Sequence, residues 1–305
     1  MQNYDVVIIA NLKGGSANMS TVDGLCAHLS RRDRTVTVLP TTPEPGSAMK
    51  LAREAVAGGA QLVIAFGGDG TVCQVAEGLI GTDTAMAAYP AGTGNLFART
   101  YYSRLAPELF VNMVLDGTAQ GVDMIRLDYV DIHGVQHNRL FMTALGLGPL
   151  SDATLVSQDV KRIFGKLAYV FGVGKAALNL KPVHFELTLD DKGLTRERKV
   201  QAAVVVIANV LPPNMSLFSR GCNASDGLMD TAYLAARNVL DLIPSVGWLP
   251  LGCPERSRFY GRVRTGCLKI KTNVPVIPNV DGDASPATTE LSLKVVPGAV
   301  KMVLI

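Results

Sequence analysis

The most informative part of this chain is a pair of glycine-rich turns, LVIAFGGDGT at residues 62–71 and AMAAYPAGTGN at residues 85–95. Each turn directly follows an apolar run that is typical of a buried strand. Backbone amides without bulky side chains, at the carboxyl ends of adjacent strands, allow a phosphate chain to approach closely. Asp69 lies between the glycines of the first turn and offers a carboxylate to Mg²⁺. Two such turns in tandem indicate a phosphotransferase that uses a nucleotide.

The composition is that of a globular protein with room for two domains. Apolar residues make up 48% of the 305 residues and charged residues 18%, which excludes a disordered chain. Lys and Arg outnumber Asp and Glu by only 29 to 26, and aromatic residues make up 6%. Neither value favours nucleic-acid binding, which relies on a basic surface and on base stacking. We therefore expect no nucleic-acid partner.

The cysteines and the amino-terminal segment indicate a cytoplasmic protein. The five cysteines are odd in number and contain no CxxC pair, which favours reduced thiols over a disulfide framework or a zinc site. The chain begins MQNYDVVIIA, without the basic segment of a signal peptide. No apolar run approaches the roughly 20 residues of a membrane-spanning helix. The oligomeric state stays open, with a homodimer as one possibility.

The first part of the chain alternates strands with helices. Apolar runs predict strands at residues 5–10, 35–39, 62–66 and 85–89. Amphipathic segments follow them, among them residues 47–56 and a helix that begins at Pro107 and ends before Gly117. This alternation predicts a doubly wound, mostly parallel sheet whose ligands bind outside the carboxyl ends of the strands. We assign residues 1–121 to this nucleotide-binding α/β domain.

From about residue 121 the pattern changes to strands separated by turns. Residues 124–132 with 138–144, and residues 184–189 with 199–209, read as two hairpins. Further strands are predicted at residues 229–234, 268–272, 276–280, 290–295 and 300–305, and one helical segment at residues 153–179. The pattern predicts an antiparallel, β-rich sandwich over residues 122–305.

With these motifs together, the chain resembles the diacylglycerol kinase catalytic family, which includes bacterial lipid kinases and sphingosine kinases. The GGDGT turn alone is shared with NAD kinases and phosphofructokinases, whereas the ordered set is much more specific. The set comprises GGDGT, GTGN, Gly165-Lys166-Leu167-Ala168-Tyr169, Ala208-Asn209, Ala224-Ser225-Asp226-Gly227-Leu228 and Asp281-Gly282-Asp283.

The resemblance implies that the first domain binds ATP and that the β-rich domain supplies the lipid site. It also implies that Asp69 holds the catalytic Mg²⁺, through water because Mg²⁺ gives up its hydration shell reluctantly. A lysine in a glycine-rich turn can reach a phosphate, although it is often only solvated. The residues that line the nucleotide would be Asn11, Lys13, Gly14, Gly15, Thr42, Gly67, Gly68, Asp69, Gly70, Thr71 and Thr93.

The resemblance also implies a catalytic base near the end of the chain. The family places its general base at the glutamate of an Asp-Gly-Glu motif, and this chain has Asp283 there. Asp283 would remove the proton of the acceptor hydroxyl, and Asp281 would position the metal or the loop. Aspartate is one methylene shorter than glutamate, which alters its reach. A second departure is Leu12, where the family has proline.

The same comparison suggests a second, structural Mg²⁺. Some bacterial members bind it at the position of Asn223, Asp226 and Leu228, through one carboxylate and backbone carbonyls. A loop rich in oxygen ligands can do this. An ordinary turn, signalled by Ser-Asp-Gly, explains these residues equally well.

Two further patterns have a structural and a functional interpretation. Asn95 precedes the helix expected from Leu96, and capping that helix would explain it completely. In an extended segment Arg256, Arg258, Arg262 and Arg264 would share one face with Tyr260. Such a basic stripe suits an anionic membrane surface, while an ordinary solvated strand face is the plainer explanation.

We therefore interpret the chain as an ATP- and Mg²⁺-dependent lipid kinase whose acceptor is diacylglycerol or a long-chain base presented at a membrane surface. Peripheral contact would be with the inner face of the membrane. One alternative is an NAD kinase-like enzyme, which expects an Asn-Glu motif that Gln74 and Glu77 do not form. Another is a non-catalytic regulator that binds a nucleotide or a lipid, an interpretation supported by Leu12 and Asp283.

Overall fold

The chain divides into two compact units that are not continuous in sequence. The computed structural model describes residues 5–13, 18–102, 105–149, 151, 181–191, 193–211, 218, 221–238, 240–241, 248 and 253–304. The first unit comprises Met1–Met124, Ala224–Asp226 and Val296–Ile305, and the second comprises Ile125–Asn223 and Gly227–Val295. The helix expected at residues 153–179 and the motif at residues 165–169 lie outside the described residues.

The first unit contains the expected parallel sheet. Its strands pair in the order β2-β1-β3-β4, with every pairing parallel. The central strand has the sequence VVIIA and every residue buried, as in a sheet covered on both faces. The doubly wound α/β fold is confirmed. The strands are β1 (Val6–Ala10), β2 (Val36–Pro40), β3 (Leu62–Gly67) and β4 (Ala85–Pro90).

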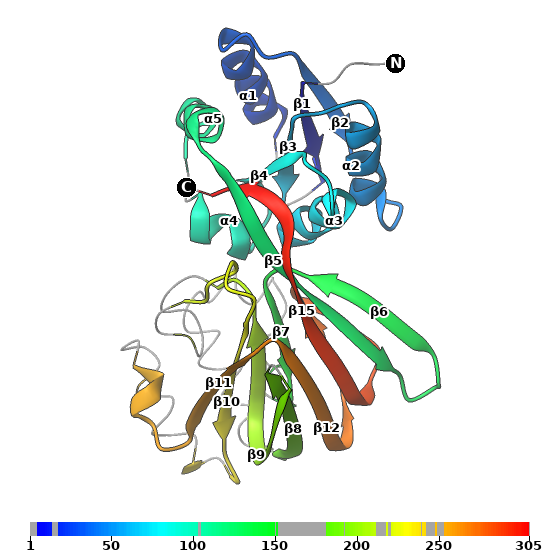
Figure 1. Cartoon of the computed structure of the whole chain (residues 1–305), viewed down its shortest axis with the longest axis vertical. Coiled ribbons are helices and arrows are strands. Elements are labelled where there is room, and N and C mark those ends of the chain that lie inside the picture. Colours follow the sequence, from blue (N-terminus) through cyan, green and yellow to red (C-terminus); the bar gives the residue numbers. More distant parts are fainter. Residues whose placement is uncertain are drawn as a thin grey trace. The chain divides into compact units, whose positions relative to one another are not determined.

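Helices cover both faces of this sheet, with α1 and α5 on one face and α2 and α3 on the other (Figure 1). Local sequence sets where several of them begin. Asn18 caps α1 by accepting the amide of Thr21 at 2.8 Å, and Pro107 is the first residue of α5. The helices are α1 (Met19–Arg31), α2 (Ser47–Ala57), α3 (Asp69–Leu79), α4 (Leu96–Tyr101) and α5 (Pro107–Asp116).

Close packing of α2 on α3 depends on Gly78. A Cβ atom at this position would lie 2.6 Å from Cβ of Ala52 and 2.7 Å from the carbonyl oxygen of Met49. The second of these contacts is with backbone, which cannot rotate out of the way. The glycine therefore sets the separation of the two helices.

The last strand of the chain corrects two expectations. Residues 290–295 and 300–305 were expected as separate strands of the second domain, but they belong to one strand, β15 (Thr288–Val303). Within this strand Gly298 adopts φ +56°, and Asp123 Oδ1 accepts its amide at 2.8 Å. Its final residues pair in parallel with β4, through Met302 and Met86. Val296–Ile305 therefore belongs to the first unit, although the sequence placed it in the second domain.

The second unit is antiparallel and β-rich, as expected. Its strands follow the path β14-β13-β7-β9-β8-β12-β15. On one branch β5 pairs with β15 and β6 with β5, and on the other β10 pairs with β9 and β11 with β10. Both expected hairpins form, one from β5 and β6 and one from β8 and β9. The strands are β5 (Ala119–Val130), β6 (Gln136–Phe141), β7 (Ala144–Leu147), β8 (Val183–Asp191), β9 (Leu194–Ala208), β10 (Met229–Ala235), β11 (Tyr260–Thr265), β12 (Cys267–Val276), β13 (Asn279–Val280) and β14 (Asp283–Ala284).

Two strand boundaries in this unit differ from the expectation. The strand expected at residues 138–144 is interrupted at residues 142 and 143, so its parts belong to β6 and β7. The strand expected at residues 276–280 is also interrupted, because Pro278 has no amide to donate to a ladder. Apolar content alone did not mark these breaks.

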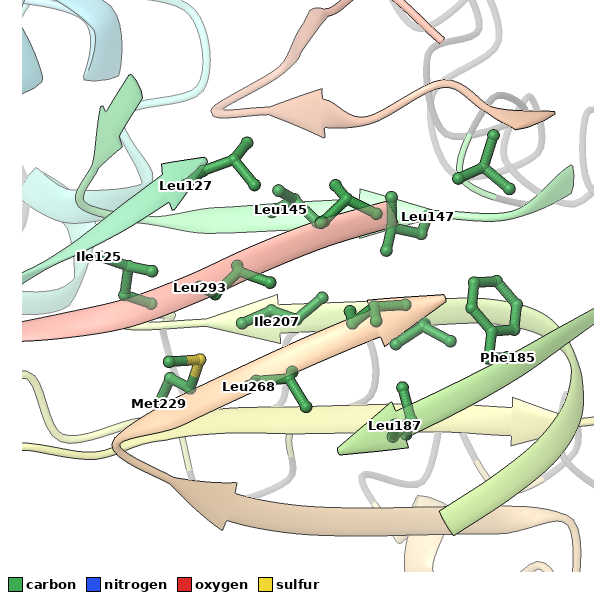
Figure 2. Packing of buried hydrophobic residues seen from close by; sticks show 14 of the residues in the cluster. Ile125, Leu127, Leu145, Leu147, Phe185, Leu187, Ile207, Met229, Leu268 and Leu293 are labelled. Carbon is green, nitrogen blue, oxygen red and sulfur yellow. The ribbon is translucent and has the colours of Figure 1, made fainter. Parts of the chain in front are cut away.

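One apolar cluster forms the core of the second unit. Side chains from its long strands, among them Phe185, Leu187, Ile207 and Leu268, meet on a common face (Figure 2). All four are at most 1% exposed. The alternation of these strands directs every second residue into this cluster.

We predict that Gly78→Ala destabilises the first unit although alanine favours helix formation. The added methyl group overpacks the contact with α2, which typically costs about 1–3 kcal/mol of unfolding free energy. Urea unfolding measures the effect. Gly70→Ala in the same helix is the matched control, since nothing lies within 4 Å of its Cβ position. The packing argument is wrong if the two variants have equal stability.

Candidate functional site

The first glycine-rich turn joins β3 directly to α3. Gly67 ends the strand, Gly68 is the N-cap residue and Asp69 begins the helix. As a glycine, the N-cap residue has no side chain with which to cap α3. Its first-turn amides are therefore available to an anion, and the dipole of this 11-residue helix favours negative charge at that end.

The second glycine-rich turn packs against the first. Gly67 pairs with Pro90 at the end of the two strands, and the amide of Ala91 donates to the Gly67 carbonyl at 3.1 Å. A Cβ atom on Gly92 would lie only 2.4 Å from Cα of Gly68, so no other residue fits there without a backbone shift. The two turns therefore form one surface at the carboxyl edge of the parallel sheet.

The Asp69 carboxylate joins the two turns. Its Oδ2 accepts the amide of Leu96 and its Oδ1 accepts the amide of Phe97, both at 3.0 Å. Asp69 therefore supplies the cap of α4, a contact between residues far apart in sequence. A carboxylate at a helix N-terminus also interacts favourably with the helix dipole.

The expectation that Asn95 caps α4 is wrong. Asn95 adopts a left-handed conformation, φ +50°, and makes no side-chain capping bond. Its side chain instead accepts the Gly92 amide at 2.8 Å and donates to the Gly92 carbonyl at 2.7 Å. Asparagine tolerates this backbone conformation better than most residues, so it closes the second turn while Asp69 takes over the capping.

Asn11 connects the end of β1 to the first glycine-rich turn. Its Nδ2 donates to Thr71 Oγ1 at 3.2 Å, and its backbone amide donates to the Phe66 carbonyl at 2.9 Å. Its Oδ1 accepts the amide of Lys13 at 3.2 Å, and the Lys13 side chain is exposed. The structure thus brings two of the expected nucleotide-lining residues, Asn11 and Thr71, into direct contact. Gly14 and Gly15 lie outside the described residues.

Thr42 and Thr93 lie beyond the ends of β2 and β4, which two strands separate in the sheet, and both residues are exposed. Thr42 follows β2, and its amide donates to Ser47 Oγ at 2.8 Å, which fixes the start of α2. Thr93 belongs to the turn after β4. Both hydroxyl groups are accessible to a ligand at the carboxyl edge of this sheet.

The residues at this edge fit a polyphosphate and a hydrated cation. Phosphate oxygens require N–H donors, and the α3 N-terminus and the glycine-rich turns provide them. Each Asp69 oxygen already accepts one amide. A carboxylate oxygen can accept a second bond, so Asp69 retains the capacity to hold the water ligands of Mg²⁺.

In the second unit Asp281 holds a turn in place. It has φ +52°, and its Oδ1 accepts the amides of Thr143 at 3.1 Å and of Ala144 at 3.2 Å, together with the Thr143 hydroxyl. Its own amide donates to the Ala144 carbonyl at 2.9 Å. These contacts fit the loop-positioning role for Asp281.

Asp283 differs from Asp281 in being accessible. Its side chain is 76% exposed, and its Oδ2 lies 3.6 Å from Nη2 of Arg139. Arg139 also donates to Ser285 Oγ at 3.2 Å, so it is held beside the carboxylate. Nothing in the sequence marked Arg139, because it lies on a different hairpin 144 residues earlier in the numbering.

The residues suggested for a structural magnesium site lie close to the start of β10. Asn223 and Asp226 are exposed residues in the segment that precedes β10. The described part of the chain contains no group of three or more His, Cys, Asp or Glu residues placed to hold a metal. A site built from Asn223, Asp226 and the Leu228 carbonyl would not be such a group, so this assignment stays a prediction.

The proposed arginine stripe does not form. Arg256 lies in the short 3₁₀ helix η1 (Pro254–Arg256), so only part of the segment is extended. Arg262 and Arg264 bind Asp230 at 2.8 and 3.1 Å, and the Asp230 side chain is only 1% exposed. A buried carboxylate needs such partners. The charges of Arg262 and Arg264 therefore compensate Asp230 and do not form a free basic surface. Burial, with a smaller effect of Asp230, raises the pKa of the neighbouring Cys222 thiol to about 12.

Membrane association through a spanning helix finds no support in the described residues. Within them, no helix combines the length and the apolar character needed to cross a bilayer.

Several known proteins with related sequences are named as lipid kinases. A sequence profile described as the diacylglycerol kinase catalytic domain matches residues 5–127. A protein from Mycobacterium tuberculosis named "Diacylglycerol kinase" is 30% identical over 243 residues, which cover 77% of this chain and 75% of the relative. A protein from Pseudomonas fluorescens named "Probable lipid kinase YegS-like" is 29% identical over 265 residues, covering 86% and 83%.

Solved structures show the same fold. A diacylglycerol kinase from Bacillus anthracis superposes with a TM-score of 0.70 at 21% identity, covering 100% of this chain and 98% of the other. Yeast NADH kinase in complex with NADH gives a TM-score of 0.55 at 11% identity, covering 98% and 82%. These structures establish the fold, whereas the sequence relatives establish the family. The chain belongs to the diacylglycerol kinase catalytic domain family of lipid kinases.

Proposed function

We propose that this kinase transfers the γ-phosphoryl group of ATP, with Mg²⁺, to a hydroxyl group of a membrane-derived lipid. Diacylglycerol or a long-chain base is the proposed acceptor class. The main support for nucleotide binding is the single surface that the two glycine-rich turns form, with Asp69 connecting them. The names of the relatives support the lipid acceptor.

The phosphate chain would bind at the α3 N-terminus. The amides of Gly70 and Thr71 belong to the first turn of α3, where an anion is favoured by both hydrogen bonds and the helix dipole. Asn11 holds the Thr71 hydroxyl at 3.2 Å and so orients it. Lys13, Thr42 and Thr93, with Gly14 and Gly15, complete the proposed nucleotide-binding set.

Asp69 would hold the hydrated metal ion at this surface. Mg²⁺, when bound, neutralises charge that develops on the phosphoryl oxygens. The hydrogen bonds from the Leu96 and Phe97 amides fix the direction of the Asp69 carboxylate. This metal-binding side chain therefore does not need to be ordered when the nucleotide binds. The first two amides of α4 therefore orient the proposed metal ligand.

Asp283 would act as the general base. Its accessible carboxylate accepts the proton of the acceptor hydroxyl as that oxygen forms a bond to the γ-phosphorus atom and the bond to the β-phosphate oxygen breaks. ADP leaves with the electrons of that bond. The short Asp281-Gly282 turn, fixed to Thr143, supports the loop that carries Asp283.

We further propose that the enzyme works in the cytoplasm, where ATP is available, and contacts the inner face of the membrane peripherally. All five cysteines are free thiols, which suits a reducing compartment. Self-association as a homodimer is part of the same proposal and is measured by sedimentation velocity.

The direct test is phosphoryl transfer from labelled ATP to a panel of acceptors. The panel contains diacylglycerol, a long-chain base and, for the NAD kinase alternative, NAD. A phosphorylated lipid formed only with Mg²⁺ is the expected result. Phosphorylation of NAD in place of lipid would favour the NAD kinase alternative. Nucleotide binding with no product from any acceptor would favour the regulator.

We predict that Asp69→Asn lowers both the stability of the fold and the effect of Mg²⁺ on nucleotide binding and turnover. One oxygen remains to accept two amides, so unfolding free energy falls by about 0.5–2 kcal/mol, as for loss of a helix cap. Turnover falls by about 10–100-fold, as for loss of an outer-shell metal ligand. Urea unfolding and the Mg²⁺ dependence of nucleotide affinity measure the two effects separately. Asp83→Asn is the control: this side chain is 98% exposed and pairs only with Lys301 at the surface among the described residues, so both quantities should change little.

We predict that Asp283→Asn lowers kcat by about 100-fold or more, because the amide cannot accept the hydroxyl proton. The KM for ATP and the unfolding midpoint stay unchanged, since the side chain is exposed. Asp283→Glu should keep kcat within about tenfold. Asp281→Asn should instead lower stability, because three donors lose a charged acceptor. Full kcat in Asp283→Asn contradicts the assignment of the base.

A further inference from the structure

The turn between β5 and β6 exposes three aliphatic side chains. Val130 is 54% exposed, Ile132 is 55% and Val135 is 53%. Single exposed aliphatic residues are ordinary on protein surfaces, but three within six positions at one turn form a concentrated patch. Figure 1 shows this turn as the end of a long hairpin in green.

A second loop brings two more aliphatic residues to the same end of the second unit. Val274 and Ile277 are each 43% exposed and lie near the end of β12. The start of β15 separates the two loops, because the amide of Ile132 donates to the Ala287 carbonyl at 2.9 Å while Val276 pairs with Thr288. They are thus two strand spacings, about 10 Å, apart. We call the five residues Val130, Ile132, Val135, Val274 and Ile277 the apolar rim.

The hairpin turn satisfies its own backbone donors. Every amide from Asp131 to Val135 has an acceptor within the unit. Asp131 Oδ1 accepts the amides of His133 at 2.8 Å and Val135 at 2.9 Å. The other acceptors are the carbonyl groups of Asp131, Val135 and Ala287. An unsatisfied amide is very costly in a lipid environment, so this turn is suited to enter one.

The carboxylate of the turn is also largely buried and hydrogen-bonded. The Asp131 side chain is only 6% exposed, and its Oδ2 lies 2.9 Å from Nε2 of His137. The hydrogen bond to His137 is the main reason that the pKa of Asp131 lies below its usual value. Residues 272–278 contain no acidic residue. Neither loop of the apolar rim therefore presents an exposed carboxylate to an anionic headgroup layer.

We propose that the apolar rim is the surface through which this enzyme docks on a lipid bilayer, with Ile132 and Val135 entering the boundary between headgroups and acyl chains. This inference rests on the proposed lipid acceptor. Docked segments of this kind enter the bilayer by about 5–10 Å. Arg139 lies four residues along β6 from Val135, about 13 Å, and contacts Asp283. Docking at the rim therefore holds the proposed base close above the level where lipid hydroxyl groups lie.

The first experiment measures binding to vesicles of phosphatidylcholine mixed with phosphatidylglycerol, without nucleotide and without acceptor lipid. Ile132→Ser should weaken binding by about tenfold, because an aliphatic side chain no longer leaves water. Leu194→Ser is the matched control, at a residue of the same unit that is also 55% exposed. It should bind like the unaltered protein. Equal binding of both variants overturns the proposal.

A second experiment locates the inserted residue directly. Ile132→Trp should show a blue-shifted difference emission, relative to the unaltered protein with its single tryptophan, when vesicles are added. Leu194→Trp should show no shift. If Ile132→Ser instead abolishes a dimer seen by sedimentation velocity and leaves vesicle binding intact, the rim is a self-association surface and the proposal is wrong.

Kinase rates on a dissolved and on a vesicle-embedded acceptor distinguish the docking role of the apolar rim from the proposed lipid kinase activity. Ile132→Ser should phosphorylate a short-chain diacylglycerol dissolved as monomers at the unaltered rate, and lose rate only when the acceptor is embedded in vesicles. Rim-dependent vesicle binding by a protein that phosphorylates no lipid would refute the proposed acceptor and leave the docking surface in place. An equal loss of rate on both substrate forms would contradict the docking role.

Discussion

The organisation of the nucleotide-binding unit depends on one carboxylate that bonds two amides. Asp69 begins one helix and caps another, and the close contact of Gly92 with Gly68 allows this. Without the two glycines the turns would be pushed apart, and without the carboxylate α4 would lose its only described cap. The same oxygens are those that the proposed metal site requires. The structural role and the proposed metal-binding role of Asp69 therefore fall on a single side chain.

The sequence predicted features that arise from local periodicity. The parallel sheet, its helices, both hairpins and the common edge of the two glycine-rich turns follow from strand-to-helix alternation and from strongly apolar strands such as β1. These signals lie within a few residues of each other, where spacing determines which side chains share a face.

The errors concern contacts between residues far apart in the chain. Asn95 had the right position and residue type for a cap, but Asp69, 26 residues earlier, took that role. The alternating arginines predicted a free basic face, but Asp230 lies buried on the neighbouring strand and binds two of them. Arg139 beside Asp283 had no sequence signal at all. Each of these pairings depends on which strands become neighbours, and periodicity along one segment does not contain that information.

The continuity of β15 has a consequence for how the protein is made. The final part of β15 pairs with β4, and the Tyr102 hydroxyl donates to the Val303 carbonyl at 2.5 Å. During synthesis the ribosome completes the whole second unit before it releases the residues that cover this edge. A nascent chain of the first 124 residues therefore exposes β4 for many seconds, given elongation at about 5–20 residues per second. Until the end of β15 has been synthesised, this edge of β4 is open to pairing with other chains.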